Sequence, residues 1–241
     1  MGEAWKWTSA NRRTTGGEGP SATTLQWGED VEHTVSSWRG LLCKPGVIHC
    51  YDDPILAVLM DPAHGRYSSR GGLLWRCEWS GRTVAAADKR GVETLRTIRA
   101  VDPPAITTEQ RVEIAIRASL VVLPVARRWA EGAGRGDVIT HLDAVELWAV
   151  RWLDGADRSD ASARAARAAW AASWAASWAA SSAAEAASWA ARTTAVAAAA
   201  EAASSAAEAA ESAAWAARAG LPLDLVAICR RVAGAPRRED G

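Results

Sequence analysis

A long alanine-rich stretch constrains this chain more than any other feature of its sequence. Between Gly155 and Gly220 there is no Gly or Pro, and pairs of Ala recur at regular intervals. The pairs begin at residues 165, 168, 171, 175, 179, 183, 186, 190, 198, 202, 206, 209, 213 and 216, with one further step through Thr194-Ala195. They advance 51 residues in 14 steps, or 3.64 residues per step. This period matches the roughly 3.6 residues per turn of an α-helix, and Ala has the highest helix propensity, so a long helix is predicted over 157–219.

The Ala pairs form a stripe along one face of the predicted helix, and large side chains flank it. Every Trp of the stretch directly precedes an Ala pair, whereas Ser often follows one. An Ala stripe lets two backbones approach closely but buries little area per residue, so it needs length or a partner. The predicted interaction residues are Trp170, Trp174, Trp178, Trp189, Trp215, Ala179 and Ala186.

Two features of the stretch leave alternatives open. The poor helix formers within Arg192–Val196 allow either a single rod or a hairpin whose halves pack Ala face to Ala face. The Trp side chains fit burial against helices of the same chain, and they equally fit an exposed ridge that docks a partner or a second copy. Self-association or another protein is therefore the predicted partner.

Composition excludes several classes of function. The formal net charge is zero at pH 7, which gives no basic footprint for nucleic acid. The uncharged run 168–184 is too short for a membrane span of about 20 residues. The first residues lack the apolar core of a signal peptide, and the four Cys have no paired spacing. These features predict a protein of the cytoplasm that contacts neither nucleic acid nor membrane.

The fold class predicted is α+β, with a small mixed domain before an all-α region. A helix is predicted to start at Asp53-Pro54 and to stop at Asp61-Pro62, and strands are predicted within 47–51, 73–79 and 92–99. The predicted segments are a flexible N-terminus (1–24), the α+β domain (25–104), a helical pair (105–156), the Ala-rich helix (157–219), and a short helix with a disordered tail (220–241).

The helical pair carries clear start signals and a clear apolar face. Thr107 and Gln110 have the spacing of a capping box, and Pro124 is predicted to interrupt the helix that follows. In the second helix, over 137–153, apolar residues recur at helical spacing. The residues predicted to face inward are Val138, Leu142, Val145, Trp148 or Ala149, and Trp152.

Residues of about 25–100 resemble an uncharacterised domain of phage and bacterial proteins. The marks of that domain are a Cys, a Gly-aromatic-His-x-Cys strand, an Asn/Asp-Pro-led helix and a strand with a Cys/Val-Glu pair. They correspond here to Cys43, Gly46, His49-Cys50, Asp53-Pro54 and Cys77-Glu78. This chain departs from the pattern in two ways: the strand is Gly-Val-Ile-His-Cys, so that His49 is displaced by one residue, and the loop before Leu73 is longer. The Trp152–Ser159 segment and the Ala-rich array that follows resemble phage-type proteins as well. The resemblance implies a phage or prophage origin and carries no known activity, with virion association as an alternative to the host cytoplasm.

Two kinds of chemistry remain as alternatives. His49, Tyr51 and Glu78 follow one another along the small domain in an order that loosely resembles an ADP-ribosyltransferase site. Zinc would need Cys43, His49, Cys50 and Cys77, with His64 nearby, to converge tetrahedrally, yet no Cys-x-x-Cys pair is present. We therefore predict a non-enzymatic interaction or assembly protein without metal or cofactor, and keep the transferase-like enzyme or effector as the alternative.

Overall fold

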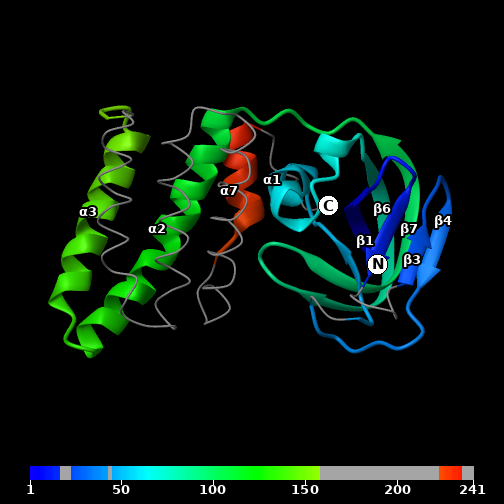
Figure 1. Ribbon diagram of the computed structural model, residues 1–241, viewed down its shortest axis with the longest axis horizontal. Helices are drawn as coiled ribbons and strands as arrows, with labels where there is room; N and C mark the ends of the chain where they lie inside the picture. Colours follow the sequence, from blue (N-terminus) through cyan, green and yellow to red (C-terminus); the bar gives the residue numbers. More distant parts are fainter. Residues whose placement is uncertain (17–22, 43–44, 158–222, 235–241) are drawn as a thin grey trace. The chain divides into compact units, whose positions relative to one another are not determined.

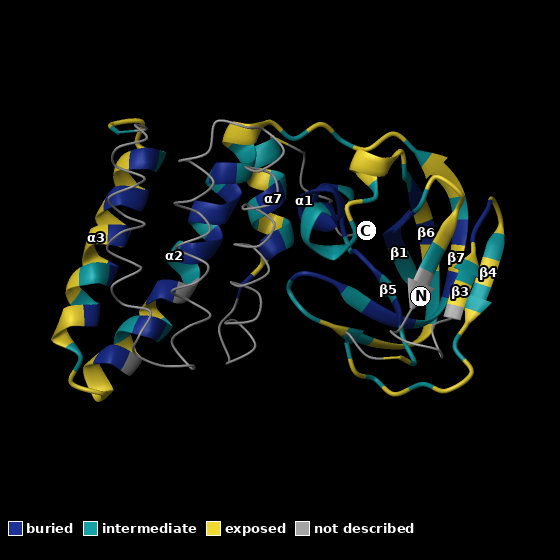
Figure 2. Ribbon diagram, in the orientation of Figure 1, coloured by how far each residue is buried: buried dark blue, intermediate teal, exposed yellow. Residues whose placement is uncertain are grey.

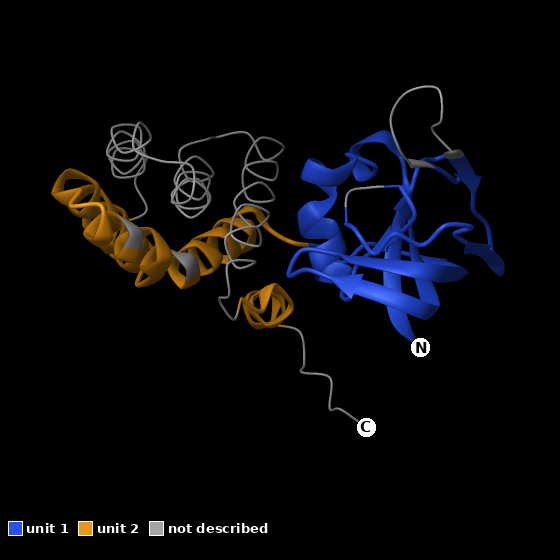
Figure 3. Cartoon of the chain, turned by 90° about the horizontal axis from the view of Figure 1, so that it is seen from below, with its two compact units in different colours: residues 1–105 blue, residues 106–241 orange. Residues whose placement is uncertain are grey.

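The chain divides into two compact units, residues 1–105 and 106–241, shown in blue and orange in Figure 3. The computed structural model describes residues 1–16, 23–42, 45–157 and 223–234. Strands dominate the first unit and helices follow in the second (Figure 1). The described residues thus have the mixed sheet and helix content of an α+β protein, as predicted.

One antiparallel sheet forms the framework of the first unit. Its strands are β1 (Gly2–Thr8), β4 (Val31–Thr34), β5 (Ile48–Cys50), β6 (Leu73–Ala85) and β7 (Arg90–Val101). Their order is β1-β6-β7-β4, and β5 pairs with another part of β7. Trp5 of β1 and Tyr51, just after β5, exchange backbone hydrogen bonds of 2.9 and 2.8 Å. The pairing β1–β6–β7–β5–β1 therefore closes the sheet around an interior.

Small and aromatic side chains fill that interior. The buried cluster consists of Ala4, Trp27, Ile48, Cys50, Trp75, Cys77, Val92 and Leu95. The chain has 14 Trp and no Phe, so Trp supplies the large aromatic volume. A buried indole N–H needs an acceptor, and that of Trp75 donates to the Thr8 hydroxyl at 3.0 Å. The interior is thus apolar in bulk but carries polar groups that hydrogen bonds must satisfy.

A second, two-stranded sheet positions one of these aromatic residues. It pairs β2 (Arg13–Gly16) with β3 (Thr23–Gln26), and Trp27 follows β3 directly. The backbone N–H of Trp27 donates to the Arg12 carbonyl at 2.7 Å, and its indole N–H donates to the Thr14 hydroxyl at 2.8 Å. The small hairpin thereby fixes Trp27 in the core.

Helix α1 (Pro54–His64) packs against β1, and most of its side chains are buried (Figure 2). Its start agrees with the sequence prediction, because the Asp53 carboxylate accepts from the N–H of Ile55 at 2.8 Å and of Leu56 at 3.3 Å. The indole N–H of Trp7 donates to the Ala57 carbonyl at 2.9 Å. These contacts attach α1 to the face of β1 opposite the closed interior.

The predicted stop of this helix at Asp61-Pro62 is wrong. Pro62 lies inside α1, whose last residue is His64. A Pro in the final turn removes one hydrogen bond at most, and the Asp61 carboxylate compensates by accepting from the N–H of Tyr67 at 2.8 Å and of Ser68 at 3.0 Å. These bonds hold the turn that leads into the short 3₁₀ helix η2 (Ser68–Arg70).

Two further local expectations are wrong in this unit. Residues 2–8, which belong to the segment predicted to be flexible, form β1. The strand predicted within 73–79 is too short, because β6 passes through a bulge between Ser80 and Thr83 and continues to a hairpin tip over residues 86–89. In both places long-range strand pairing outweighs local Gly, Ser and Thr content.

Three helices make up the described part of the second unit: α2 (Thr108–Gly132), α3 (Gly136–Leu153) and α7 (Leu225–Ala233). The capping box is confirmed, because the N–H of Thr107 donates to Gln110 Oε1 at 2.9 Å and the N–H of Gln110 donates to Thr107 Oγ1 at 3.1 Å. Pro124 lies within α2 and does not end it, contrary to the predicted interruption.

Helix α2 packs against both α3 and α7. The face predicted for α3 is confirmed, since its buried residues are Val138, Leu142, Val145, Trp148, Ala149 and Trp152. Arg127 of α2 forms ion pairs with Asp143 at 2.6 Å and Glu146 at 2.8 Å of α3. The Gln110 side chain donates to the Val232 carbonyl of α7 at 3.3 Å. The predicted Ala-rich helix lies outside the described residues, except for Asp157.

Candidate functional site

A cluster of polar side chains lies where the tip of the β6–β7 hairpin meets the end of α1. Tyr51 follows β5 directly, His64 ends α1, and Asp88 and Lys89 belong to the tip. The side chain of His64 is 15% exposed, that of Lys89 8% and that of Asp88 0%, while Tyr51 is buried. The N–H of Ala86 donates to the Lys89 carbonyl at 2.9 Å and closes the tip. A hairpin tip that carries two charges is thus withdrawn from solvent.

His64 is the centre of this cluster. Its Nδ1 lies 2.9 Å from the Tyr51 hydroxyl, and the two rings stack with centroids 5.9 Å apart. Its Nε2 lies 3.4 Å from Lys89 Nζ and 3.7 Å from Asp88 Oδ2. Lys89 Nζ is itself 3.4 Å from Asp88 Oδ2. The side chains of Tyr51, Asp88 and Lys89 therefore surround the His64 ring and form one connected polar set with it.

His49 lies beside this cluster, on β5 and two residues before Tyr51. Alternation along β5 turns Ile48 and Cys50 into the closed interior and His49 to the other face. Burial, the largest cause, together with the positive charges of Lys6 and Lys89 and with His64, lowers the pKa of His49 to about 4. His49 is consequently neutral at ordinary pH.

A second buried ionisable group, Lys6, lies in the closed interior. Only 8% of Lys6 is exposed, and its Nζ donates to the His49 carbonyl at 2.9 Å. The ammonium also lies 5.1 Å from the ring centroid of Trp27, within range of a cation–π interaction. Burial lowers the pKa of Lys6, although the nearby thiols of Cys50 and Cys77 oppose this effect. A lysine in such surroundings is a common mark of a functional site, and it also occurs as a structural compromise.

The predicted transferase-like residues do not come together as a set. Tyr51 joins the cluster through His64 and His49 lies beside it, as their proximity along β5 dictates. Glu78 of β6 is exposed, and strand register places it opposite Glu3 of β1, two residues along that strand from the partner of Tyr51. The carboxylate next to the imidazole is therefore Asp88 and not Glu78.

The residues of the alternative zinc site differ in position and in protonation. Cys43 lies outside the described residues, whereas His49 faces away from Cys50. Burial raises the pKa of the Cys50 thiol to about 12, and it also raises the pKa of Cys77. A thiol held protonated is a poor metal ligand. Among residues 1–16, 23–42, 45–157 and 223–234, no group of three or more His, Cys, Asp or Glu could hold a metal ion.

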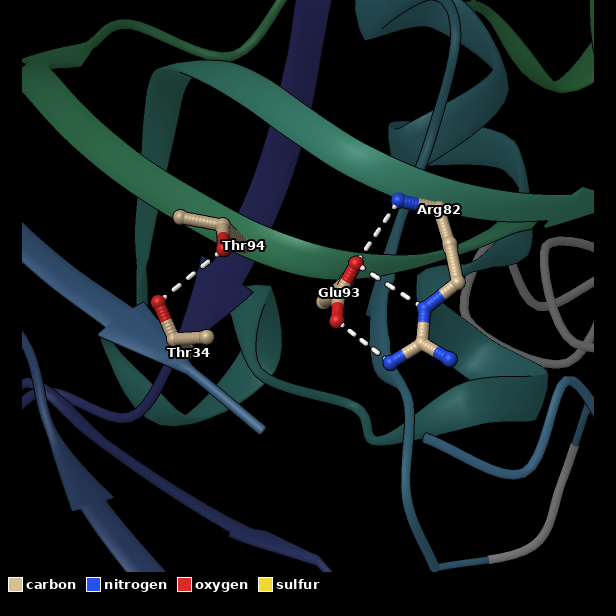
Figure 4. Close-up of polar contacts among 4 residues, drawn as sticks. All are labelled: Thr34, Arg82, Glu93 and Thr94. Atoms are coloured by element: carbon tan, nitrogen blue, oxygen red, sulfur yellow. Dashed lines mark hydrogen bonds and ion pairs between the residues drawn. The ribbon is translucent and has the colours of Figure 1, made fainter. Parts of the chain in front are cut away.

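A separate polar arrangement fixes the bulge of β6 (Figure 4). Glu93 of β7 accepts from the backbone N–H of Arg82 at 2.9 Å and from its guanidinium at 3.1 and 2.6 Å. Hydrogen bonding to Arg82 lowers the pKa of Glu93 to about 2. The hydroxyls of Thr34 and Thr94 meet at 2.9 Å on the neighbouring strand pair. This exposed set shapes the sheet and brings together no catalytic pair.

All of the predicted interaction residues fall outside the described part of the chain. They are Trp170, Trp174, Trp178, Trp189, Trp215, Ala179 and Ala186. Their predicted role stays a prediction.

The buried charges at positions 6, 88 and 89 were not identified from the sequence. Lys6 alternates with Trp5 and Trp7, a pattern that ordinarily places the lysine on a solvent face. Closure of the sheet buries the Lys6 face of β1, and α1 covers the other face. Asp88-Lys89 has the polar character of an ordinary exposed turn. The one sequence feature that favours its burial is its position directly after the apolar run Val84–Ala87.

Comparison with protein-family models, curated proteins and solved structures finds no match to this chain. No helix in the described part of the chain is long and apolar enough to cross a membrane. The described residues therefore establish the fold class of the protein: a unit built on a sheet, followed by a helical unit.

Proposed function

We propose that this chain is a non-enzymatic interaction or assembly protein that uses its Ala-rich stretch for close helix packing. The observation that carries the proposal is the step of 3.64 residues between Ala pairs, maintained over 14 steps. Without selection for one helical face, the Ala pairs would not recur at the helical interval over 14 steps. The resemblance to phage-type proteins extends the proposal to a phage or prophage origin.

The mechanism follows from the size of the side chains. Ala on a helix face allows the backbone of a second helix to approach closely, while each Ala buries little area. The five Trp beside the stripe would supply the larger buried areas, because Trp is enriched among residues that dominate interface energies. The partner is a second copy or another protein.

The charges of the first unit are consistent with a protein partner. Four of its arginines are held in ion pairs with acids of the same unit: Arg76 with Glu3, Arg82 with Glu93, Arg90 with Asp52 and Arg96 with Asp30. An arginine committed to an internal carboxylate offers less to a phosphate backbone. Together with the zero net charge, this supports a partner other than nucleic acid.

Light scattering on the full chain tests the proposal. Ala179→Glu and Ala186→Glu place a charge in the centre of the stripe and are expected to lower the oligomeric mass. Ala133→Glu makes the same change in the exposed α2–α3 turn and is expected to leave the mass unchanged. An unchanged monomeric mass for all four proteins would refute self-association. A wild-type monomer that gains a partner in a two-component mixture, with the gain abolished by Ala179→Glu, would instead identify another protein.

A further inference from the structure

Helix α3 has a buried face and, opposite to it, an exposed face (Figure 2). An α-helix turns by about 100° per residue, which places seven exposed positions of α3 within an arc of about 120° centred on Leu147. These positions form the α3 outer face, and they are Thr140, Asp143, Ala144, Leu147, Val150, Arg151 and Asp154.

The centre of the α3 outer face is apolar. Leu147 is 60% exposed and Val150 is 44% exposed, and Ala144, one turn before Leu147, is exposed as well. Single exposed apolar side chains are ordinary on protein surfaces, whereas adjacent ones mark a surface that contacts another molecule. The outer face therefore has the apolar centre of a contact surface.

The charges of the α3 outer face differ in sign on the two sides of Leu147. Asp143 lies four residues before Leu147, and Arg151 lies four residues after it. Asp143 pairs with Arg127 of α2 at 2.6 Å, yet its side chain is still 58% exposed. Arg151 is exposed and forms no ion pair with another residue of the described part of the chain. The face thus presents a carboxylate at one end and a guanidinium at the other.

The α3 outer face is complementary to itself when two copies of the helix lie antiparallel, with Leu147 on the two-fold axis. Each contact between unlike residues then occurs twice, as in any two-fold symmetric interface. A parallel pair would instead bring Arg151 against Arg151 and Asp143 against Asp143, and like charges repel. The facing pairs of the antiparallel arrangement are Leu147 with Leu147, Ala144 with Val150, Asp143 with Arg151, and Thr140 with Asp154.

We propose that the α3 outer face binds a second copy of this chain in this antiparallel, two-fold symmetric contact. Burial of Leu147 and its apolar neighbours supplies the attraction, and the two Asp143–Arg151 pairs fix the direction and the register. Seven side chains from each copy are fewer than the roughly 20–30 of a standard interface, so this contact alone forms a weak and transient dimer. The proposal does not rest on the packing proposed for the Ala-rich stretch, because the two surfaces share no residue.

Disulfide cross-linking of a Leu147→Cys variant tests the contact in the full chain. Cys50, Cys77 and Cys229 are buried, and Cys43→Ser removes the fourth native thiol. Helices that pack about 8–10 Å apart bring the residues on the two-fold axis within the ~7 Å between Cα atoms that a disulfide requires. Oxidation by copper phenanthroline in concentrated solution is expected to link this variant into a covalent dimer. Thr140→Cys is expected to stay monomeric, since antiparallel packing separates its two copies by about 20 Å.

The same variants exclude other occupants of the α3 outer face. The absence of a link through Leu147→Cys would overturn the proposal, and protection of its thiol from maleimide would then identify residues 158–222 of the same chain as the cover. Equal linking of Leu147→Cys and Thr140→Cys would overturn the antiparallel direction. Ala179→Glu is expected to leave the Leu147→Cys link intact, and loss of the link would show that the Ala-rich stretch, and not α3, holds the copies together.

A charge exchange tests the register without any cysteine. Arg151→Asp places two carboxylates opposite each other at both ends of the contact, and it is expected to raise the dissociation constant of the dimer at least about tenfold in sedimentation equilibrium. Adding Asp143→Arg restores opposite charges and is expected to return the constant to within about threefold of the wild type. Glu146 remains as a partner for Arg127 in the double variant. Dimerisation that Arg151→Asp leaves unchanged, or that the folded double variant does not regain, would overturn the proposed pairing.

Discussion

Replacement of Lys6 by Met tests whether the buried lysine stabilises or destabilises the closed interior. The change keeps an unbranched side chain of similar length and removes the charge. It also removes the hydrogen bond to the His49 carbonyl, which is worth about 1.5–3 kcal/mol for a charged donor, and the contact with the Trp27 ring, worth about 2 kcal/mol when desolvated. Against this stands the desolvation of the ammonium, which amounts to several kcal/mol in real proteins.

The pH of the experiment sets an upper limit on the desolvation penalty of Lys6. Folding can keep Lys6 neutral at a cost of about 1.4 kcal/mol for each pH unit below its ordinary pKa, or at most about 5 kcal/mol at pH 7. Since the bonds lost and the penalty removed are similar in size, the apolar burial of Met decides the sign. We expect Lys6→Met to raise the free energy of unfolding by about 1–2 kcal/mol at pH 7, as is often seen when buried charges are replaced.

The pH dependence gives a sharper readout than the value at one pH. Because burial lowers the pKa of Lys6 below 10.5, the unfolded chain binds more protons than the folded chain, and stability rises with pH toward that value. Urea denaturation up to pH 9 is expected to show this rise at pH values above the lowered pKa of Lys6, by at most about 1.4 kcal/mol per pH unit, in the wild type and not in Lys6→Met. Above pH 9 the raised pKa values of Cys50 and Cys77 act in the opposite direction, so the assay stops there.

A charge-matched control isolates the effect of burial. Arg76→Met removes one positive charge from the neighbouring strand, where Arg76 is exposed and pairs with Glu3. Its pH profile is expected to parallel that of the wild type. If Lys6→Met lowers stability by more than about 2 kcal/mol and keeps the wild-type pH slope, then the hydrogen bond dominates and the reasoning about desolvation is wrong.

Two further predictions concern the elements around the cluster. Asp53→Ala removes the cap of α1 and is expected to lower the free energy of unfolding by about 1–2 kcal/mol in urea denaturation, while Asp102→Ala in the linker changes it by less than about 0.5 kcal/mol. Because the pKa of His49 is lowered to about 4, its contribution to stability is lost as pH falls from about 6.5 toward 4. His49→Gln is expected to flatten the acid side of the stability profile, and an unchanged slope would contradict this account.

The features predicted correctly from the sequence depend on residues close together in the chain. The Asp53 cap, the Thr107–Gln110 capping box and the apolar face of α3 are all confirmed, because each arises from spacings of two to four residues. Such patterns carry their own geometry, since helix periodicity fixes which side chains share a face.

The features missed depend on pairing between distant strands. β1 pairs with β6, about 70 residues further along the chain, and Tyr51 completes the closed sheet by bonding to Trp5. No local pattern marks Gly2–Thr8 as a strand buried on both faces, so Lys6 has the pattern of a surface residue. For the same reason the predicted transferase-like set grouped Glu78 with His49 and Tyr51, whereas the carboxylate that approaches His64 belongs to Asp88.

The two buried ionisable sites of the first unit are joined through the short strand β5. Lys6 binds the backbone carbonyl of His49 on one face, and Tyr51 binds His64 on the other. Charges on both Lys6 and His64 act on His49, which lies between them. A proton lost from Lys6 therefore reduces the positive potential that opposes a proton on His49. Lys6 in the interior of the sheet and the polar cluster around His64 on its outer face consequently belong to one electrostatic system, coupled at His49.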